Sequence, residues 1–136
     1  FAGTGNISFE FASRGSIKIT SVDIDSGCIK FIEKTIAEIG LDNMDVIKED
    51  VFKYISKTNQ KADLIFADPP FDFSQEEFES IPNTVFEREM LNECGMLVVE
   101  HFNKMDLSHL ENFSFSRKYG ASVFSFFEVE TEEEEE

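Results

Sequence analysis

Short apolar runs that are typical of β-strands alternate with stretches of helical periodicity along the first two thirds of the chain. Strands separated by helices usually pair in parallel, and the helices pack on the faces of the sheet. The alternation therefore predicts an α/β fold with a mostly parallel sheet and helices on both faces. A further pair of strands around Gly120 predicts an antiparallel hairpin at the carboxyl end. The strands are expected at 17–22, 44–47, 63–67, 96–100, 113–119 and 122–127.

Local signals place helices between these strands. Apolar residues recur at helical spacing over 26–39, where Asp25 or Ser26 can cap the first turn and Gly40 ends the last one. A shorter helix at 7–14 is expected to end at Gly15, and another is expected at 51–57.

A capping-box pattern, Ser74 with Glu77 three positions later, predicts a helix start at that point. We expect a second helix at about 83–93 that ends at Gly95. Both cysteines, Cys28 and Cys94, then fall in helical stretches without metal-ligand spacing. They are interpreted as free thiols of a reducing compartment, hence the cytosol.

The strand at 63–67 is followed directly by Asp68-Pro69-Pro70-Phe71. Two consecutive prolines cannot continue a strand ladder or enter a helix interior, so the backbone here is stiff and extended. In open α/β sheets, ligands bind at the carboxyl ends of the strands. A carboxylate and proline carbonyls beside an aromatic ring suit a flat ring that carries an amino group. By itself, the tetrapeptide is equally consistent with a turn in which proline only stops the strand.

A glycine turn stands at the start of the chain, in Phe1-Ala2-Gly3-Thr4-Gly5-Asn6. Gly3 and Gly5 allow a tight turn and a close approach of a ligand to the backbone. Asp23, at the end of the next strand, can accept hydrogen bonds from both ribose hydroxyls of a nucleoside. Ser8 replaces the third glycine of a dinucleotide motif, which favours a nucleoside without phosphate. A plain tight turn is the alternative interpretation.

The composition is strongly acidic, with 28 acidic and 12 basic residues and a formal charge of −16. Such a charge opposes binding to nucleic acid, because that affinity rests largely on neutralising phosphates. The densest basic cluster is interpreted as a solvated helix face, and it consists of Lys48, Lys53, Lys57 and Lys61. No apolar run approaches the roughly 20 residues that span a bilayer. We expect no metal site, and we interpret His101 and His109 as structural or surface residues.

Taken together, these features resemble the class I S-adenosylmethionine-dependent methyltransferases, over residues 1 to about 129. The Asp-Pro-Pro-Phe quartet is similar to motif IV of the members that modify exocyclic amino groups. The likeness is closest to bacterial enzymes that methylate a guanine exocyclic amino group in small-subunit ribosomal RNA. It rests on Phe1-Ala2-Gly3-Thr4-Gly5, Asp23-Ile24-Asp25, Asp68-Pro69-Pro70-Phe71 and Arg117-Lys118-Tyr119-Gly120-Ala121-Ser122.

The resemblance implies a Rossmann-like fold and S-adenosylmethionine as the cofactor. Its binding residues would be Phe1, Ala2, Gly3, Thr4, Gly5, Asp23, Ile24, Asp50 and Val51. Within this set, Asp50 would hold the adenine amino group and the Val51 amide would bond a ring nitrogen. A role of Asp50 as the cap of the helix at 51–57 fits equally well and is compatible with the first.

The resemblance also implies the catalytic residues Asp68, Pro69, Pro70 and Phe71. Asp68 and the Pro69 carbonyl would accept the two hydrogens of the target amine and direct its lone pair toward the methyl group. Phe71 would stack on the target base. Asp68 is also a candidate acceptor of the released proton.

Enzymes of this kind carry a basic, RNA-facing segment and a first strand ahead of the glycine turn, and neither precedes Phe1 in this sequence. We therefore expect a catalytic domain at 1–130 without that segment, followed by an acidic tail at 131–136. The expected partner is ribosomal RNA or the small ribosomal subunit, bound through the basic segment by a monomer. A DNA adenine-N6 methyltransferase and a non-catalytic domain that retains the fold are the alternatives.

Overall fold

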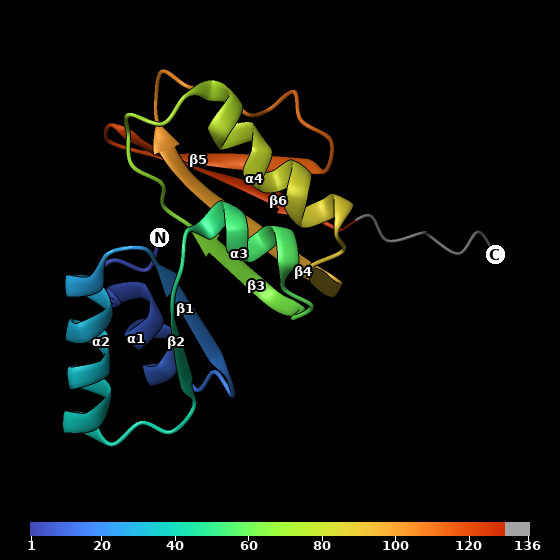
Figure 1. Ribbon diagram of the computed structural model, residues 1–136. Coiled ribbons are helices and arrows are strands. Elements are labelled where there is room, and N and C mark those ends of the chain that lie inside the picture. The colour runs from blue at the N-terminus through green and yellow to red at the C-terminus, as the bar shows by residue number, and fades with distance from the viewer. Residues whose placement is uncertain (130–136) are drawn as a thin grey trace. The chain divides into compact units, whose positions relative to one another are not determined.

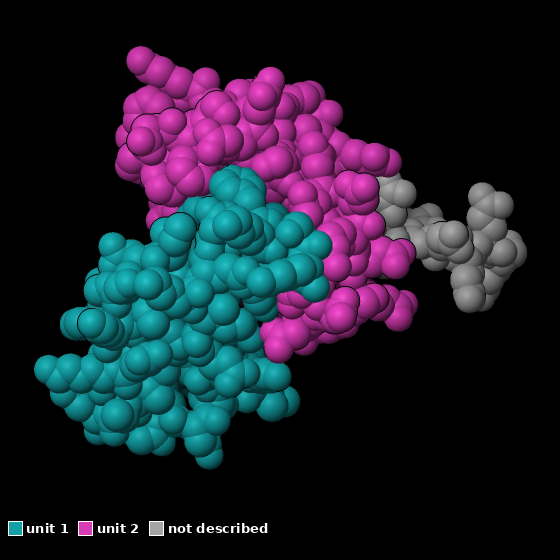
Figure 2. Space-filling view, viewed as in Figure 1, with its two compact units in different colours: residues 1–57 teal, residues 58–136 magenta. Residues whose placement is uncertain are grey.

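The computed structural model describes residues 1–129, and the predicted acidic tail at 131–136 lies outside the described residues. The chain divides into two compact units, Phe1–Lys57 and Thr58–Glu136 (Figure 2). The prediction of a single domain at 1–130 stays a prediction.

The first unit contains two parallel strands and three helices (Figure 1). Strand β1 pairs with β2 in a register that runs from Ile19↔Met44 to Asp23↔Lys48. Parallel pairing places the carboxyl ends of both strands at the same edge. In chain order, the elements are α1 (Asn6–Ser13), β1 (Ile19–Asp23), α2 (Ser26–Ile39), β2 (Met44–Lys48) and α3 (Val51–Lys57).

The predicted cap and stop of α2 are confirmed. The Asp25 side chain accepts a hydrogen bond from the Cys28 backbone N–H, and Gly40 ends the helix in the left-handed conformation at φ 72°. The helix thereby presents Ile32, which is fully buried, to Ile19 and Met44 of the two strands. These three side chains form the centre of the core of this unit.

The second unit is a four-stranded sheet with the order β3-β4-β6-β5. Strand β3 is parallel to β4, while β6 is antiparallel to both β4 and β5. The predicted hairpin is thus confirmed, and its second strand is the one that joins the rest of the sheet. The elements are β3 (Ala62–Ala67), α4 (Gln75–Glu87), β4 (Leu91–Phe102), β5 (Phe113–Tyr119) and β6 (Ser122–Glu128).

Helix α4 covers one face of this sheet. The Phe78 ring lies edge-on to the His101 ring, with ring centroids 6.4 Å apart. The ring centroids of Phe86 and Phe127 are 6.5 Å apart. The core between the helix and the sheet also contains Ile81, Val85, Leu97, Val99 and Leu107. Since side chains alternate along a strand, the neighbours of His101 and Phe127 point to the opposite face.

The predicted helix at 83–93 is wrong. The capping box at Ser74 and Glu77 is present, but the helix that it starts runs without interruption through Pro82 to Glu87. Pro82 lacks an N–H and removes one helical hydrogen bond, yet its ring is buried within the core. Packing of that helix face therefore overrides the local signal for a break.

The residues from Leu91 onward form β4, and they do not continue the helix as predicted. Met90 and Leu91 are buried, at 6% and 7% exposure, and Leu91 pairs with Ala62. Cys94, which was expected in a helix, lies in β4 with φ 62°, where the register with β3 shifts. Within residues 1–129, no helix has the length and apolar character that crossing a membrane requires.

Gly5 has a steric requirement that a substitution can test. At φ 86°, a Cβ on Gly5 would lie 2.9 Å from the Phe9 ring and 3.0 Å from Cγ1 of the buried Ile32. Gly15 has a similar φ of 90° with no atom near its Cβ position. Both Gly→Ala changes strain the backbone, but only Gly5→Ala also overpacks the core.

We expect Gly5→Ala to lower the free energy of unfolding by about 1–3 kcal/mol more than Gly15→Ala does. Urea denaturation of the two variants and the parent protein measures this difference. Equal losses in both variants would contradict the packing described here.

Candidate functional site

The glycine bend at the start of the chain is tied to the carboxyl end of β1. The amino group of Phe1 and the N–H of Ala2 donate to the Val22 carbonyl at 2.8 and 2.9 Å. The Gly3 N–H donates to Oδ2 of Asp23 at 2.8 Å, and the Asp25 N–H donates to Oδ1 at 2.8 Å. Asp23 therefore fixes both the bend and the turn that leads into α2.

The surroundings of this bend fit a nucleoside cofactor. A Cβ added to Gly3 would meet no atom within 4 Å, so a ligand can approach the backbone there. Each Asp23 oxygen accepts one backbone N–H and retains a lone pair for a ribose hydroxyl. Next to it, Ile24 is 63% exposed and offers an apolar surface to a ring. Ser8 accepts a hydrogen bond from Ser21 at 2.7 Å and so joins α1 to β1.

Thr4, Asp50 and Val51 complete the predicted cofactor residues of the first unit. Thr4 lies within the bend and is exposed. Oδ1 of Asp50 accepts the Lys53 N–H at 3.1 Å, so the interpretation of Asp50 as a helix cap is confirmed. Val51 is the first residue of α3. The role of Asp50 toward adenine stays a prediction, and it is compatible with capping because a second carboxylate oxygen remains.

The Asp68-Pro69-Pro70-Phe71 motif follows β3 at the edge of the second unit. Pro69 is fully buried and anchors the segment, whereas Asp68 is exposed and Phe71 is 65% exposed. The Pro70 carbonyl accepts the Phe73 N–H at 3.1 Å. The role of the Pro69 carbonyl as an acceptor for a substrate amine stays a prediction.

Glu100, near the carboxyl end of β4, is a further candidate for the site that the sequence patterns did not indicate. Ala67 pairs with Val99, so Asp68 and Glu100 are the next residues of two neighbouring parallel strands. Burial, a hydrogen bond with Asp68 and the negative charge of Asp68 raise the pKa of Glu100 to about 7. Two residues on, Phe102 contacts Phe71 edge-on, with ring centroids 6.0 Å apart.

His101 is a structural residue, as predicted. It is 1% exposed, and its Nδ1–H donates to the Phe102 carbonyl at 3.0 Å, which leaves Nε2 to accept from Ser125 Oγ at 2.7 Å. Burial lowers the pKa of His101, so the imidazole is neutral at pH 7. His109 lies at the surface and pairs with Glu79.

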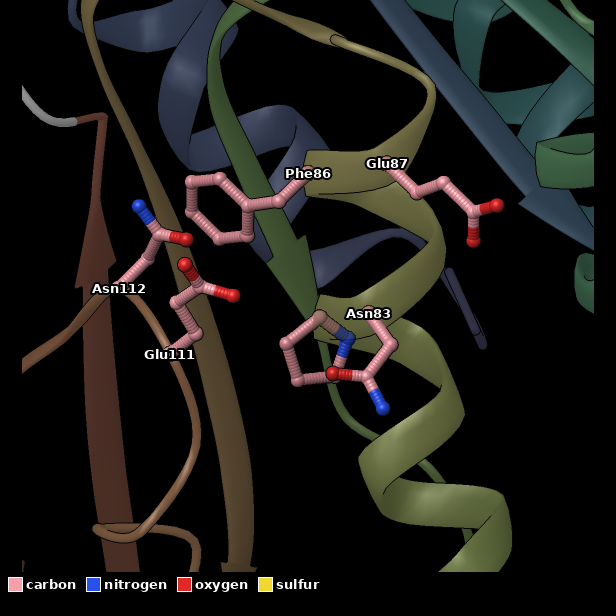
Figure 3. Close-up of a pocket in the computed structure, with 6 residues that line it drawn as sticks. Asn83, Phe86, Glu87, Glu111 and Asn112 are labelled. Atoms are coloured by element: carbon pink, nitrogen blue, oxygen red, sulfur yellow. The ribbon is translucent and has the colours of Figure 1, made fainter.

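A separate hollow of about 290 Å³ lies between α4 and the residues before β5 (Figure 3). Its lining includes the carboxylates Glu87 and Glu111 together with Asn112 and Phe86, and none of the predicted site residues. The two carboxylates make this hollow unsuitable for a phosphate or another anion.

The predicted catalytic and cofactor residues therefore fall in different units. Asp68, Pro69, Pro70 and Phe71 belong to the second unit, where β4 adds Glu100 and Phe102. The cofactor residues, 1–5, 23–24 and 50–51, belong to the first unit.

Comparison with known proteins gives one family and several relatives. The family described as Conserved hypothetical protein 95 matches residues 1–128. A ribosomal RNA small subunit methyltransferase D of Buchnera aphidicola is 32% identical over 71 residues, covering 52% of this chain and 36% of its own length. The protein of the same name from Haemophilus influenzae is 24% identical over 130 residues, covering 93% of this chain and 66% of its own length. The chain thus spans less than two thirds of these curated relatives.

Solved structures share the fold. An rRNA methylase from Streptococcus thermophilus superposes with a TM-score of 0.71 at 12% identity, over 94% of this chain and 82% of the other. The predicted Rossmann-like methyltransferase fold is confirmed by this likeness.

The hydrogen bonds of Asp23 predict its contribution to the bend. In Asp23→Ala, the N–H groups of Gly3 and Asp25 lose their acceptors, so their amide hydrogens should exchange at least about tenfold faster. Asp45→Ala, which removes an exposed carboxylate from β2, is the matched control and should leave both rates unchanged. Hydrogen exchange followed by NMR measures the effect, and slow exchange at Gly3 in Asp23→Ala would contradict the assignment.

Proposed function

This chain belongs to the family described as Conserved hypothetical protein 95, and we propose that it transfers a methyl group from S-adenosylmethionine to small-subunit ribosomal RNA. We propose the exocyclic amino group N2 of guanine as the target. The names of the curated relatives support the RNA substrate, and the Asp-Pro-Pro-Phe motif supports an amino group as the acceptor.

The observation that carries this proposal is the way the motif is presented. Pro69 is buried and holds the segment, while the Asp68 carboxylate and the Phe71 ring remain exposed at the carboxyl edge of the sheet. An exposed acid next to an exposed ring is what recognition of a flat base with an amino group requires. For a structural turn, nothing would require a 65% exposed phenylalanine at this position.

The cofactor supplies a methyl group that is electrophilic without further activation, so the protein mainly has to align the acceptor. In the first unit, the Gly3 backbone and the Asp23 carboxylate would bind its nucleoside part, and Ile24 would cover the adenine. The fit is supported by the open approach at Gly3 and the free lone pairs of Asp23.

The residues of the second unit would orient the target amine and make it more nucleophilic. An aromatic amine is a poor nucleophile because its lone pair is delocalised into the ring. Acceptance of its two hydrogens by Asp68 and the Pro69 carbonyl would localise the lone pair toward the methyl group. Stacking of the base on Phe71 would contribute about 1–3 kcal/mol. A paired base has to be flipped out of its helix to reach such a site.

Asp68 provides the first test. We expect Asp68→Ala to reduce methyl transfer by the full-length protein at least about a hundredfold, because the amine loses its charged acceptor. Binding of S-adenosylmethionine, measured by calorimetry, should change little. Asp72→Ala, in the same loop, is the matched control and should retain transfer. Near-normal turnover by Asp68→Ala would show that the catalytic assignment is wrong.

The target is tested by product analysis. The full-length protein and labelled S-adenosylmethionine are incubated with unmethylated small ribosomal subunits, with naked ribosomal RNA or with duplex DNA, each in a separate reaction. We expect label as N2-methylguanine in the ribosomal substrates. Label as N6-methyladenine in DNA would support the DNA alternative, and no binding of the cofactor would support the non-catalytic alternative.

A further inference from the structure

The carboxyl end of β4 contacts the Asp-Pro-Pro-Phe motif at two points. Glu100 lies beside Asp68, because both residues directly follow the register pair Ala67↔Val99 of two neighbouring parallel strands, and the Phe102 ring packs edge-on against the Phe71 ring. Residues 100 and 102 lie on the same face of β4, because side chains alternate along a strand. Each functional side chain of the motif is therefore supported by one side chain of the neighbouring strand.

His101, between them, points to the other face and holds this end of the strand in place. Its ring accepts from Ser125 Oγ of β6 at 2.7 Å and donates to the Phe102 carbonyl at 3.0 Å. The ring is also packed edge-on against Phe78 of α4. Glu100 is thus carried by a rigid, buried segment, whereas Asp68 is exposed and would be free to change rotamer without a partner.

Two carboxyl groups can hydrogen bond to one another only if one of them carries a proton. Glu100 is the less exposed of the two. Burial first, then the hydrogen bond and the negative charge of Asp68, raise the pKa of Glu100 to about 7. Below about pH 7, Glu100 therefore holds a proton.

Within residues 1–129, no basic side chain is a register neighbour of this pair in the sheet. On β6, the residue opposite Glu100 is Phe124, with Val123 and Ser125 beside it. The nearest charges of β5, Arg117 and Lys118, pair with Phe124 and Val123 and are therefore one strand further away. Asp68, which directly follows β3, is thus the charged group next to Glu100 among the described residues of the adjoining strands.

We propose that Glu100 is a positioning residue, whose protonated carboxyl donates a hydrogen bond to the Asp68 carboxylate and holds it ready to accept the hydrogens of the target amine. The catalytic consequence rests on the proposed function, whereas the proton-sharing pair itself does not. When Glu100 loses its proton, two negative charges face each other and Asp68 loses its donor.

The pair is tested without any methyl transfer by ¹³C NMR of protein labelled at the glutamate carboxyl groups. Wild type should contain one Glu that titrates near pH 7. In Asp68→Asn, the negative charge is gone and the pKa of this Glu should fall toward its ordinary value of 4.5. The signal should be absent in Glu100→Gln. No Glu titrating above about pH 6, or a titration unchanged by Asp68→Asn, would overturn the pairing.

Thermal unfolding gives a second test, because the direction in which the melting temperature changes with pH is determined by the raised pKa of Glu100. A raised carboxyl pKa stabilises the folded state below the unfolded pKa, and that contribution is lost as the pH rises through the folded value. The melting temperature of wild type should therefore fall relative to that of Glu100→Gln between about pH 5 and pH 8. Glu93→Gln, an exposed glutamate on the same strand, is the matched control and should parallel wild type. Parallel curves for wild type and Glu100→Gln would contradict the proposal.

The kinetic experiment follows methyl transfer to small ribosomal subunits by the full-length protein as a function of pH. We expect kcat of wild type to decline as the pH rises through about 7, where Glu100 ionises. Glu100→Ala should lower kcat about tenfold at pH 6 with little change in KM, because the donor to Asp68 is lost. In Glu100→Gln, the amide N–H still donates, so most of the loss should be rescued and the decline above pH 7 should disappear.

The arms separate the two hypotheses. If wild type contains the Glu that titrates near pH 7 but transfers no methyl group, the proposed function is overturned and the Glu100–Asp68 pair still stands. Transfer by wild type with the same pH profile in Glu100→Gln would overturn the positioning role, since a purely structural glutamate would not set that profile.

Discussion

Parallel strand pairing is the constraint on which the rest of this structure depends. Each unit contains one parallel pair, β1 with β2 and β3 with β4, and in both the carboxyl ends meet at one edge. Acids placed after such strands become neighbours although they are far apart in the chain, as Asp68 and Glu100 are. The antiparallel strand β6 runs the opposite way and contributes buried Ser125 and Phe127 to the core instead. The parallel strands β3 and β4 thus place the candidate site residues at one edge of the sheet, whereas β6 contributes to the buried core.

Sequence patterns were reliable where one local interaction decides the structure. The cap of α2 by Asp25, its end at Gly40 and the capping box at Ser74 each satisfy backbone groups within a few residues, and all three are present. The helix expected at 83–93 was wrong because long-range packing decides that segment. Burial of Pro82 in α4 and of Leu91 against Ala62 outweighs the local preference for a break at one and for a helix at the other.

The candidate site was predictable only in part, for the same reason. The Asp68 motif is contiguous, so its position after a strand could be inferred from the sequence. Glu100 could not be inferred, because its neighbour is fixed by the register Ala67↔Val99 and not by spacing along the chain. The sequence does contain a usable signal, because Ala67-Asp68 and Val99-Glu100 are both the end of an apolar run followed by an acid. Where two such strands are parallel neighbours in matching register, their acids are expected to meet.

A shared proton would also bear on the proposed action of this acidic protein on RNA, which is a polyanion. The formal charge of −16 works against RNA, and one lysine of the basic cluster, Lys57, is already paired with Glu49 at 2.5 Å. At a separation of about 4 Å, each additional carboxylate repels a phosphate by about 1–4 kcal/mol, depending on the local dielectric constant. Under the proposed function, a neutral Glu100 would add no charge beside Asp68, which would remain the acceptor for the amine. An Asp-Asp or Asp-Glu pair with both groups ionised would offer a stronger acceptor but would oppose the approach of the RNA that carries the base. In the proposed function, the proton on Glu100 would therefore lower the charge that opposes the RNA and leave Asp68 as a negative acceptor.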